Sequence, residues 1–283
     1  MNIVRKIQPF LLEMANYYPV VVVTGPRQSG KTTLTQQAFP EKNYISLEAL
    51  DNRAFASEDP RGFLEEYKEG AVIDEIQHTP ELLSYIQDVI DKNPKKGRFI
   101  LTGSQNFMLS QAISQTLAGR CGILTLLPPD WSELQCFPNS PEDLLSLLWQ
   151  GCYPRIYDQN IPAQRWLADY TTTYVQRDVR QITQITDLNT FTIFMKLCAG
   201  STAQEVNLSR LGNDAGISHN TAKSWLSVMQ TAWLVQTLPA WHRNIRKQIV
   251  KAPKLHFIDT GLVCYLLVLQ QHCIDGYSES ESG

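Results

Sequence analysis

A glycine-rich loop that carries a lysine and two threonines is the stretch of the sequence best suited to chemistry. Gly25, Gly30, Lys31 and Thr32 form the pattern G-x-x-x-x-G-K-[ST]. In this pattern the loop amides cradle phosphate groups, the lysine reaches the β- and γ-phosphates, and the hydroxyl binds Mg²⁺. We therefore expect ATP and Mg²⁺ as ligands, with the nucleotide held by Gly25, Pro26, Arg27, Gln28, Ser29, Gly30, Lys31, Thr32 and Thr33.

Two adjacent carboxylates, Asp74 and Glu75, close the apolar stretch AVIDE. Mg²⁺ keeps much of its water shell and takes only one or two carboxylates, so we expect Asp74 to hold the ion together with Thr32. Glu75 can orient and deprotonate the attacking water. It joins Lys31 as a catalytic candidate, because phosphoryl transfer depends mainly on positioning and charge compensation. The alternative is that the pair only caps the helix that follows.

Two hydroxyls and an arginine are further candidates for the site. Thr102 and Ser104 stand at the end of the stretch FILTGSQ, and we expect one of these hydroxyls to sense the γ-phosphate or the water. The alternative is a simple turn in which Ser104 caps a helix. Arg120 ends the segment LAGR, just before another apolar stretch. It is a third catalytic candidate, for transition-state charge on a bound or neighbouring nucleotide, and the alternative is a surface arginine.

The elements that must position these residues alternate between strands and helices. The run Val20 to Val23 before the loop is typical of a strand that is buried on both faces of a parallel sheet. Alternation of this kind favours an α/β fold, in which helices sandwich the sheet. We expect a lead-in helix in residues 1–18, strands that start at about residues 20, 43, 71, 98 and 122, and helices that start at Lys31 and at the caps Asp59 and Thr79.

Chain length and composition indicate a protein of two domains without a membrane span. The chain has 283 residues, of which 43% are hydrophobic, and a formal net charge of −3 that points to no particular partner. Its six cysteines stand singly, which is typical of idle thiols in a reducing cytosol. The longest late apolar run, Leu262 to Leu269, is far shorter than the roughly 20 residues of a membrane span. We therefore expect a cytoplasmic protein.

The second half of the chain contains a pattern that is typical of DNA binding. In LSRLGNDAGISHNTAKSWL, Gly216 permits a turn between two helices and Ser218 caps the second, which is the helix-turn-helix plan, and WLVQTL and KLHFID predict the strands of a wing. Residues 203–257 hold seven Lys and Arg against two acids, which suits phosphate contacts. The alternative is a contact with protein, or a solvated basic loop. The candidate DNA-contacting residues are His219, Asn220, Lys223, Arg243, Arg246 and Lys247.

Several motifs together resemble those of the AAA+ ATPases, namely TGPRQSGKTT, LE, DEIQ, LTGSQ and LAGR. More narrowly, GCYPRIY, YTTTYVQRDV and KAPKLHFIDTGL are similar to signatures of a bacterial and archaeal group of predicted ATPases with a C-terminal domain of unknown function. The resemblance implies ATPase chemistry, a five-stranded P-loop sheet of the AAA+ type, and a sensor strand between the Asp74 strand and the phosphate-loop strand. Members of the group usually continue into a nuclease-like segment, whereas this sequence ends in GYSESESG, so no nuclease activity is carried over.

These observations predict an ATP-driven switch. The expected organisation is a P-loop AAA+ domain in residues 1–128, a helical linker or lid region in 129–200, a winged-helix region in 201–268 and a polar tail in 269–283. Hydrolysis of ATP to ADP and phosphate would switch contacts of the winged helix with DNA or a protein partner, and a homo-oligomer is a further candidate assembly. Two alternatives stay open: a slow or inactive nucleotide-binding scaffold or sensor without DNA binding, and a P-loop kinase that phosphorylates a small molecule.

Overall fold

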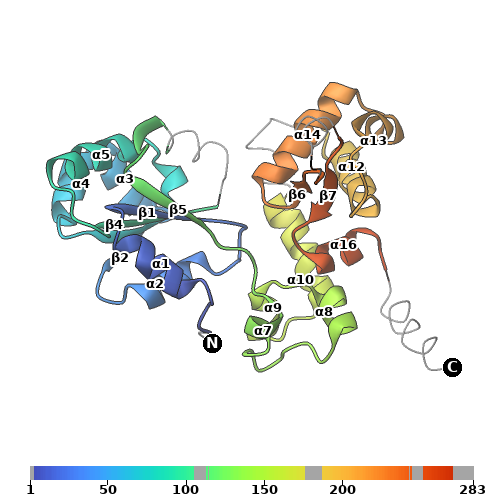
Figure 1. The fold of residues 1–283 in the computed structure, drawn as a ribbon, viewed down its shortest axis with the longest axis horizontal. Coiled ribbons are helices and arrows are strands. Elements are labelled where there is room, and N and C mark those ends of the chain that lie inside the picture. Colours follow the sequence, from blue (N-terminus) through green and yellow to red (C-terminus); the bar gives the residue numbers. More distant parts are fainter. Residues whose placement is uncertain are drawn as a thin grey trace. The chain divides into compact units, whose positions relative to one another are not determined.

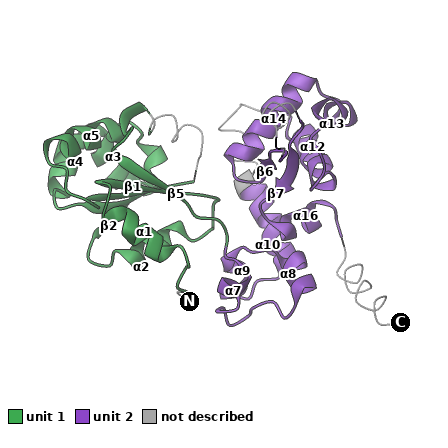
Figure 2. Ribbon diagram, in the orientation of Figure 1, with its two compact units in different colours: residues 1–128 green, residues 129–283 purple. Residues whose placement is uncertain are grey.

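The chain folds into two compact units, residues 1–128 and residues 129–283, which Figure 2 colours separately. The computed structural model describes residues 3–104, 113, 115–175, 187–241, 243 and 251–269. Of the residues singled out in the sequence, Arg246, Lys247 and almost all of the polar tail lie outside the described residues. Within the described ranges, no helix combines the length and the apolar character that a membrane span requires.

The first unit is a parallel β-sheet with helices on both faces (Figure 1). Its elements are α1 (Gln8–Ala15), β1 (Val20–Thr24), α2 (Lys31–Ala38), β2 (Asn43–Ser46), α3 (Leu50–Glu58), α4 (Pro60–Glu66), β3 (Ala71–Asp74), the 3₁₀ turn η1 (Ile76–His78), α5 (Leu82–Lys92), β4 (Phe99–Gly103) and β5 (Cys121–Thr125). All paired strands are parallel, in the order β2-β3-β4-β1-β5. The predicted α/β class is therefore confirmed, as is the place of the sensor strand β4 between β3 and β1.

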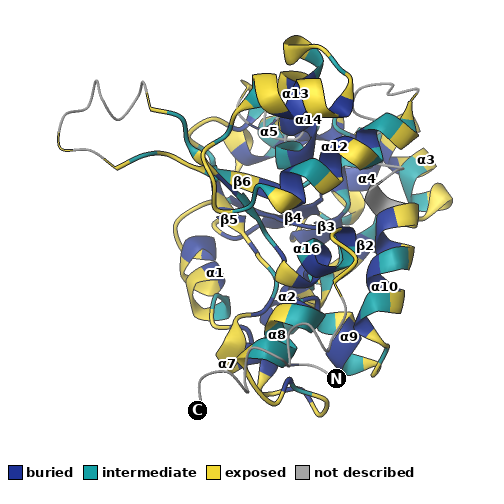
Figure 3. Cartoon of the chain, turned by 90° about the vertical axis from the view of Figure 1, so that its right-hand side faces the viewer, coloured by how far each residue is buried: buried dark blue, intermediate teal, exposed yellow. Residues whose placement is uncertain are grey.

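Alternate residues of the central strand β1 face opposite layers of helices. Val20 and Val22 pack in one core with residues of α3, α4 and α5, whereas Val21 and Val23 pack in a second core with residues of α1 and α2. All four are fully buried, and burial of a valine side chain contributes about 1.5–3 kcal/mol. The neighbouring strand β4, and β3 on its other side, are also buried along their length (Figure 3). The loop after β1 therefore starts from a firmly held strand.

Of two helix caps predicted in this unit, one is confirmed and the other is wrong. Asp59 caps α4 as predicted, because its carboxylate accepts a hydrogen bond from Gly62 N at 2.9 Å. The prediction that Thr79 caps α5 is wrong, since residues 79–81 form a turn and the helix begins only at Leu82, with Glu81 at the N-cap position. The helix has no side-chain cap, and Thr79 is itself only 1% exposed, so its side chain packs inside the unit.

The second unit is mostly helical and contains a small antiparallel hairpin (Figure 1). Its elements are α7 (Trp131–Leu134), α8 (Leu144–Gln150), α9 (Pro154–Asp158), α10 (Ala163–Tyr170), the π-helix η2 (Thr171–Val175), α12 (Leu188–Gly200), α13 (Leu208–Ala215), α14 (His219–Thr231), β6 (Val235–Leu238), β7 (Lys254–Phe257) and α16 (Thr260–Leu266). Gly216, with a φ of 71°, ends α13, and Ser218 caps α14 by accepting a hydrogen bond from Thr221 N at 3.0 Å. The turn between the two helices therefore forms where the sequence predicts it.

A buried aspartate joins two distant signature segments of the second unit. Asp259 is 1% exposed, and it caps α16 by accepting a hydrogen bond from Leu262 N at 2.8 Å. Its other carboxylate oxygen accepts a hydrogen bond from Cys152 N at 2.6 Å, so the segments GCYPRIY and FIDTGL meet at one carboxyl group. Burial raises the pKa of Asp259 to about 6, and the backbone donors oppose that rise. The helix α16 also packs against α8 and α10, so this unit has a shared core.

Candidate nucleotide-binding site

The phosphate loop connects the buried strand β1 to helix α2. Gly25 and Gly30 have φ angles of 142° and 92°, and Gln28 has a φ of 63°. A side chain on Gly25 would collide with the backbone of Leu126, so glycine serves both the backbone angle and the close approach. Turns of this kind gather backbone N–H groups into an anion-binding concavity. The N-terminus of α2 adds partial positive charge at the same place.

The ammonium group of Lys31 bends back over this loop from the first position of α2. Lys31 is 5% exposed, and Nζ donates hydrogen bonds to Gly25 O at 3.0 Å and to Pro26 O at 2.7 Å. Ser29 Oγ also donates to Pro26 O, at 2.9 Å. A positive charge is thereby held at the concavity. The other predicted nucleotide-binding residues lie around it, with Pro26 and Ser29 buried, Arg27, Gln28 and Thr32 half-buried, and Thr33 exposed.

Three hydroxyl groups converge on the carboxylate of Asp74, at the carboxyl end of β3. Thr32 Oγ1 and Tyr44 Oη donate to Oδ2 at 2.9 and 2.6 Å, and Thr102 Oγ1 donates to Oδ1. Asp74 is only 5% exposed, so these donors replace the water that a buried carboxylate lacks. The structure therefore brings together the two predicted metal ligands and one predicted sensor hydroxyl. The alternative, a helix cap, does not describe Asp74, because η1 has no side-chain cap.

This set of oxygen atoms fits Mg²⁺. The ion prefers oxygen ligands, and with a nucleotide it takes one or two carboxylates while phosphate and water supply the rest. The Thr32 hydroxyl and the Asp74 carboxylate, 2.9 Å apart beside the phosphate loop, match that donor set. In the part of the chain that the structure describes, no group of three or more His, Cys, Asp or Glu side chains could hold a metal ion. With one carboxylate and one hydroxyl, the site suits an ion whose other ligands come from phosphate and water.

Two titratable side chains beside Asp74 and Glu75 are neutral at pH 7. Burial raises the pKa of the Tyr44 phenol, and its hydrogen bond to Asp74 raises that pKa further. Burial also lowers the pKa of His78 on η1, and the nearby Arg53 lowers it further. The Tyr44 phenol therefore keeps its proton and acts as a hydrogen-bond donor.

The carboxylate of Glu75 is held by two neighbouring side chains. Ser104 Oγ donates to Oε2 at 3.3 Å, and Gln77 Nε2 donates to the same oxygen. Glu75 has a φ of 58°, and its backbone N–H donates to Thr102 Oγ1 at 3.3 Å. This conformation is uncommon outside glycine, and such strain clusters at active sites. The two hydroxyls that the sequence could not separate thus have different partners, since Thr102 contacts Asp74 and Ser104 contacts Glu75.

Arg5 supports the phosphate loop, although no motif in the sequence points to it. The residue is 7% exposed; Nη1 donates to Ser29 O at 2.9 Å and Nη2 donates to Leu127 O at 2.8 Å. Its guanidinium therefore joins the loop to the segment that follows β5. A lone arginine in the lead-in segment is too weak a signal to predict this contact, because both partners are backbone carbonyls of distant residues.

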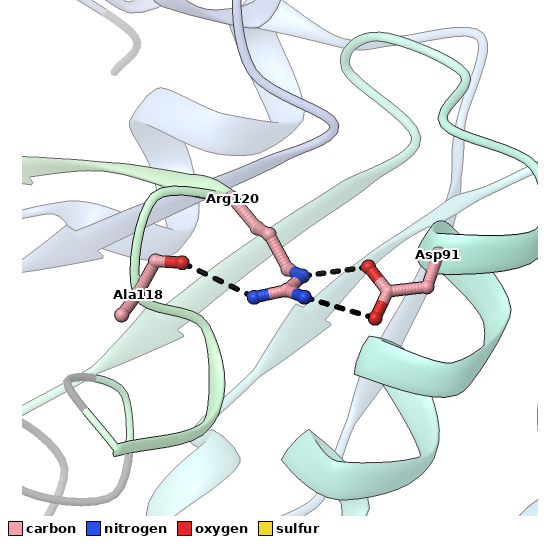
Figure 4. Close-up of polar contacts among 3 residues, drawn as sticks. All are labelled: Asp91, Ala118 and Arg120. Atoms are coloured by element: carbon pink, nitrogen blue, oxygen red, sulfur yellow. Dashed lines mark hydrogen bonds and ion pairs between the residues drawn. The ribbon is translucent and has the colours of Figure 1, made fainter.

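Arg120 lies at the opposite edge of the sheet from the phosphate loop. Cys121, which starts β5, pairs with Val20, whereas the loop follows Thr24 at the far end of β1, about 16 Å away at ~3.3 Å per residue. The guanidinium forms a two-pronged ion pair with Asp91, with Nε–Oδ1 at 2.6 Å and Nη2–Oδ2 at 3.1 Å (Figure 4). This ion pair raises the pKa of Arg120. The geometry leaves two interpretations, an arginine that serves a neighbouring subunit and a surface arginine.

The described candidates for DNA contact lie at exposed positions of the second unit. His219, Asn220 and Lys223 are exposed on the first turns of α14, and Arg243 is exposed after β6. An open groove of about 850 Å³ is lined in part by Arg210, His219 and Lys223. Exposed residues also cover much of α13 in Figure 3. These four side chains are therefore exposed to solvent, and their contact with DNA stays a prediction.

Both halves of the chain match known protein families. Residues 17–135 match the AAA domain family, and residues 141–272 match a domain of unknown function, DUF8612. The chain is 29% identical over 254 residues to the uncharacterized protein Rv2008c of Mycobacterium tuberculosis, and equally to the uncharacterized protein Mb2031c of Mycobacterium bovis. Each alignment covers 88% of this chain and 56% of the relative. The chain therefore spans little more than half the length of these relatives.

Among solved structures, the Walker-type ATPase PABY2304 of Pyrococcus abyssi has a similar fold. The TM-score is 0.60, and the match covers 93% of this chain and 95% of that chain at 14% sequence identity. The TM-score supports a shared fold, and at this low identity the match shows the fold alone. Together with the sheet order and the phosphate loop, the matches show that the chain contains an AAA domain in residues 17–135, followed by a domain of unknown function in residues 141–272.

Proposed function

We propose that the chain binds ATP with Mg²⁺ at the phosphate loop and hydrolyses the nucleotide to ADP and phosphate. The observation that carries the proposal is the convergence of Thr32 and Thr102 on the Asp74 carboxylate. Lys31 directly precedes Thr32 at the start of α2, and Glu75 directly follows Asp74. A phosphate-binding lysine, a pair of metal ligands and a carboxylate that can act as a base thus meet at one edge of the sheet.

Each of these residues has a distinct task in the proposed reaction. The loop amides and the Lys31 ammonium bind the β- and γ-phosphates, and Mg²⁺ supplies charge compensation when it is bound. Glu75 orients the attacking water and accepts its proton, while Ser104 and Gln77 hold its carboxylate in place. Thr102 donates to Asp74 and accepts from the backbone of Glu75. Its hydroxyl therefore links the positions of the two carboxylates, which supports a sensor role.

The variant Glu75→Gln tests the hydrolysis step. It keeps the size of the side chain but removes the base, and general-base catalysis contributes about 10²–10⁴-fold. We expect phosphate release from ATP to fall by a factor in that range while ATP binding persists. Glu69→Gln is a matched control, because Glu69 is an exposed carboxylate at the opposite end of β3. Normal hydrolysis in Glu75→Gln would place the base elsewhere, and a wild-type protein that binds ATP without turnover would favour the scaffold or sensor alternative.

We propose in addition that the region of α13 and α14 contacts DNA and that the nucleotide state modulates this contact. In helix-turn-helix proteins the N-terminal residues of the second helix meet base edges, and His219, Asn220 and Lys223 are exposed at those positions. The hairpin of β6 and β7 follows α14 along the chain, as a wing does. Residues 203–257 contain seven Lys and Arg but only two acids, and this positive charge also supports a phosphate-bearing partner.

Salt dependence tests the proposed DNA contact. If Lys223 neutralises one phosphate, Lys223→Ala should make the slope of log affinity against log salt shallower by about 0.9. Fluorescence anisotropy of a labelled duplex, with ATP and with ADP, measures that slope in both nucleotide states. Arg165→Ala is the control, because Arg165 is an exposed basic residue on α10, outside α13 and α14. Absence of wild-type binding at low salt would contradict the DNA contact and favour a protein partner.

A further inference from the structure

We propose that Tyr44 is a positioning residue for the divalent ion, which acts by holding the Asp74 carboxylate in the orientation that the ion requires. The inference rests on the proposed binding of ATP and Mg²⁺. Tyr44 lies on β2, outside both the phosphate loop and the segment that carries the two carboxylates.

The Asp74 carboxylate is held from both sides of its own strand. The strands β2 and β4 flank β3 in the sheet, and each contributes one hydroxyl. Thr102 on β4 donates to Oδ1, and Tyr44 on β2 donates to Oδ2 at 2.6 Å. Each oxygen therefore has a donor from a neighbouring strand, in addition to the Thr32 hydroxyl at Oδ2. The carboxylate cannot rotate without breaking at least one of these hydrogen bonds.

The contact requires a long side chain at position 44. In the register of β2 and β3, Ser46 pairs with Asp74, and Tyr44 pairs with Val72. The phenol must therefore extend along the sheet by two residues, about 6–7 Å, in the direction in which strand side chains lean. The residue is 37% exposed, and its hydroxyl reaches the carboxylate.

The two strand hydroxyls differ from Thr32 in what they can do for an ion. Thr32 is itself a candidate ligand, whereas Tyr44 acts through the ligands beside it: its hydroxyl donates to Asp74, and its side chain also interacts with Thr32. Mg²⁺ demands near-ideal octahedral geometry, and partners that orient a metal ligand change metal affinity by about 10–100-fold. Loss of the Tyr44 hydroxyl should therefore reduce the gain in ATP affinity that Mg²⁺ provides. The contact between the loop and the nucleotide should stay unchanged.

The variant Tyr44→Phe tests this inference, because it removes the hydroxyl and keeps the ring. Tyr85→Phe is a matched control; it removes a phenol hydroxyl on α5, which packs against the other face of the sheet. Isothermal titration calorimetry with ATP, once with EDTA and once with Mg²⁺, gives the factor by which Mg²⁺ strengthens ATP binding. We expect Tyr44→Phe to reduce that factor about 10-fold with unchanged affinity for metal-free ATP. Tyr85→Phe should match the wild type in both titrations.

The outcomes separate this inference from the proposed function. An unchanged factor in Tyr44→Phe, or an equal loss of affinity with and without Mg²⁺, overturns the role of Tyr44 and leaves ATP binding standing. If the wild-type protein binds no ATP in either titration, the proposed function itself fails. The double variant with Asp74→Asn is a second check. Because Tyr44 acts through Asp74, the double variant should lose no more than Asp74→Asn alone, and additive losses would contradict the inference.

Discussion

Arg5 should be required both for the stability of the first unit and for its affinity for ATP. Its guanidinium donates to Ser29 O at 2.9 Å and to Leu127 O at 2.8 Å, and the residue is 7% exposed. A hydrogen bond from a charged donor contributes about 1.5–3 kcal/mol to the free energy of unfolding. Loss of both hydrogen bonds in Arg5→Ala would therefore lower that free energy by about 3–6 kcal/mol. We expect the lower end, about 3 kcal/mol, because water can enter the vacated space and hydrate both carbonyls.

Thermal unfolding and ATP titration measure the two parts of this effect. At about 4 °C per kcal/mol for a unit of this size, Arg5→Ala should lower the melting temperature by about 12 °C. The loop also loses its anchor at Ser29, and if about 1.4 kcal/mol of the loss falls on the loop, ATP affinity drops about tenfold. Arg5→Lys should be intermediate, because an ammonium group lacks the fork that reaches two carbonyls at once. Val4→Ala is the control, since Val4 is 75% exposed next to Arg5.

Two outcomes would refute this reasoning. An unchanged melting temperature in Arg5→Ala would show that the buried guanidinium does not stabilise the unit. A lower melting temperature with unchanged ATP affinity would limit Arg5 to folding, and its contact with Ser29 O would then have no influence on the nucleotide.

Arg120→Ala should leave ATP binding intact, because Arg120 lies at the opposite edge of the sheet from the phosphate loop. If Arg120 serves a neighbouring subunit, mixing this variant with Lys31→Ala protein should restore phosphate release. An arginine finger contributes about 10³–10⁵-fold, so even partial rescue is measurable, and full activity of Arg120→Ala alone would return Arg120 to a surface role. Burial raises the pKa of Asp259 to about 6 in the folded protein, against an ordinary value of 3.8, so the folded state binds more protons between these two pH values. Its contribution to the free energy of unfolding is therefore fully present below about pH 4 and is lost as the pH rises through 6. The loss amounts to at most about 3 kcal/mol. Urea unfolding at pH 4 and pH 7.5 should show this fall in the wild type and a smaller one in Asp259→Asn, and equal falls would contradict it.

Local sequence patterns predict the strand, loop and helix of the site because their causes lie within one short segment. The run Val20 to Val23 has the apolar character of a buried strand, and the glycines and Lys31 that follow specify the loop and its anion preference. The positions of the two carboxylates follow in the same way from the end of an apolar stretch. The placement of β4 beside β1 and β3 came from family resemblance, since one strand pattern carries no record of its neighbours.

The supporting contacts could not be predicted from spacing. Arg5 acts on a carbonyl 24 positions away, and Tyr44 acts on a carboxylate 30 positions away. Both contacts exist only once the sheet has formed, because strand register and loop path decide which atoms meet. Thr79 illustrates the opposite error: its sequence favours a helix cap, but Thr79 is buried, a turn follows it, and the helix begins only at Leu82.

Calorimetric titration of ATP with Mg²⁺ into the wild-type protein and into Lys31→Ala tests the central claim, that the phosphate loop binds the nucleotide. Lys68→Ala is the control, because Lys68 is an exposed lysine near the opposite edge of the sheet. We expect saturable binding by the wild type and by Lys68→Ala, and no measurable binding by Lys31→Ala, which lacks the ammonium group that Gly25 O and Pro26 O hold over the loop. Equal ATP affinity of Lys31→Ala and the wild type, or no binding by the wild type, would contradict the account.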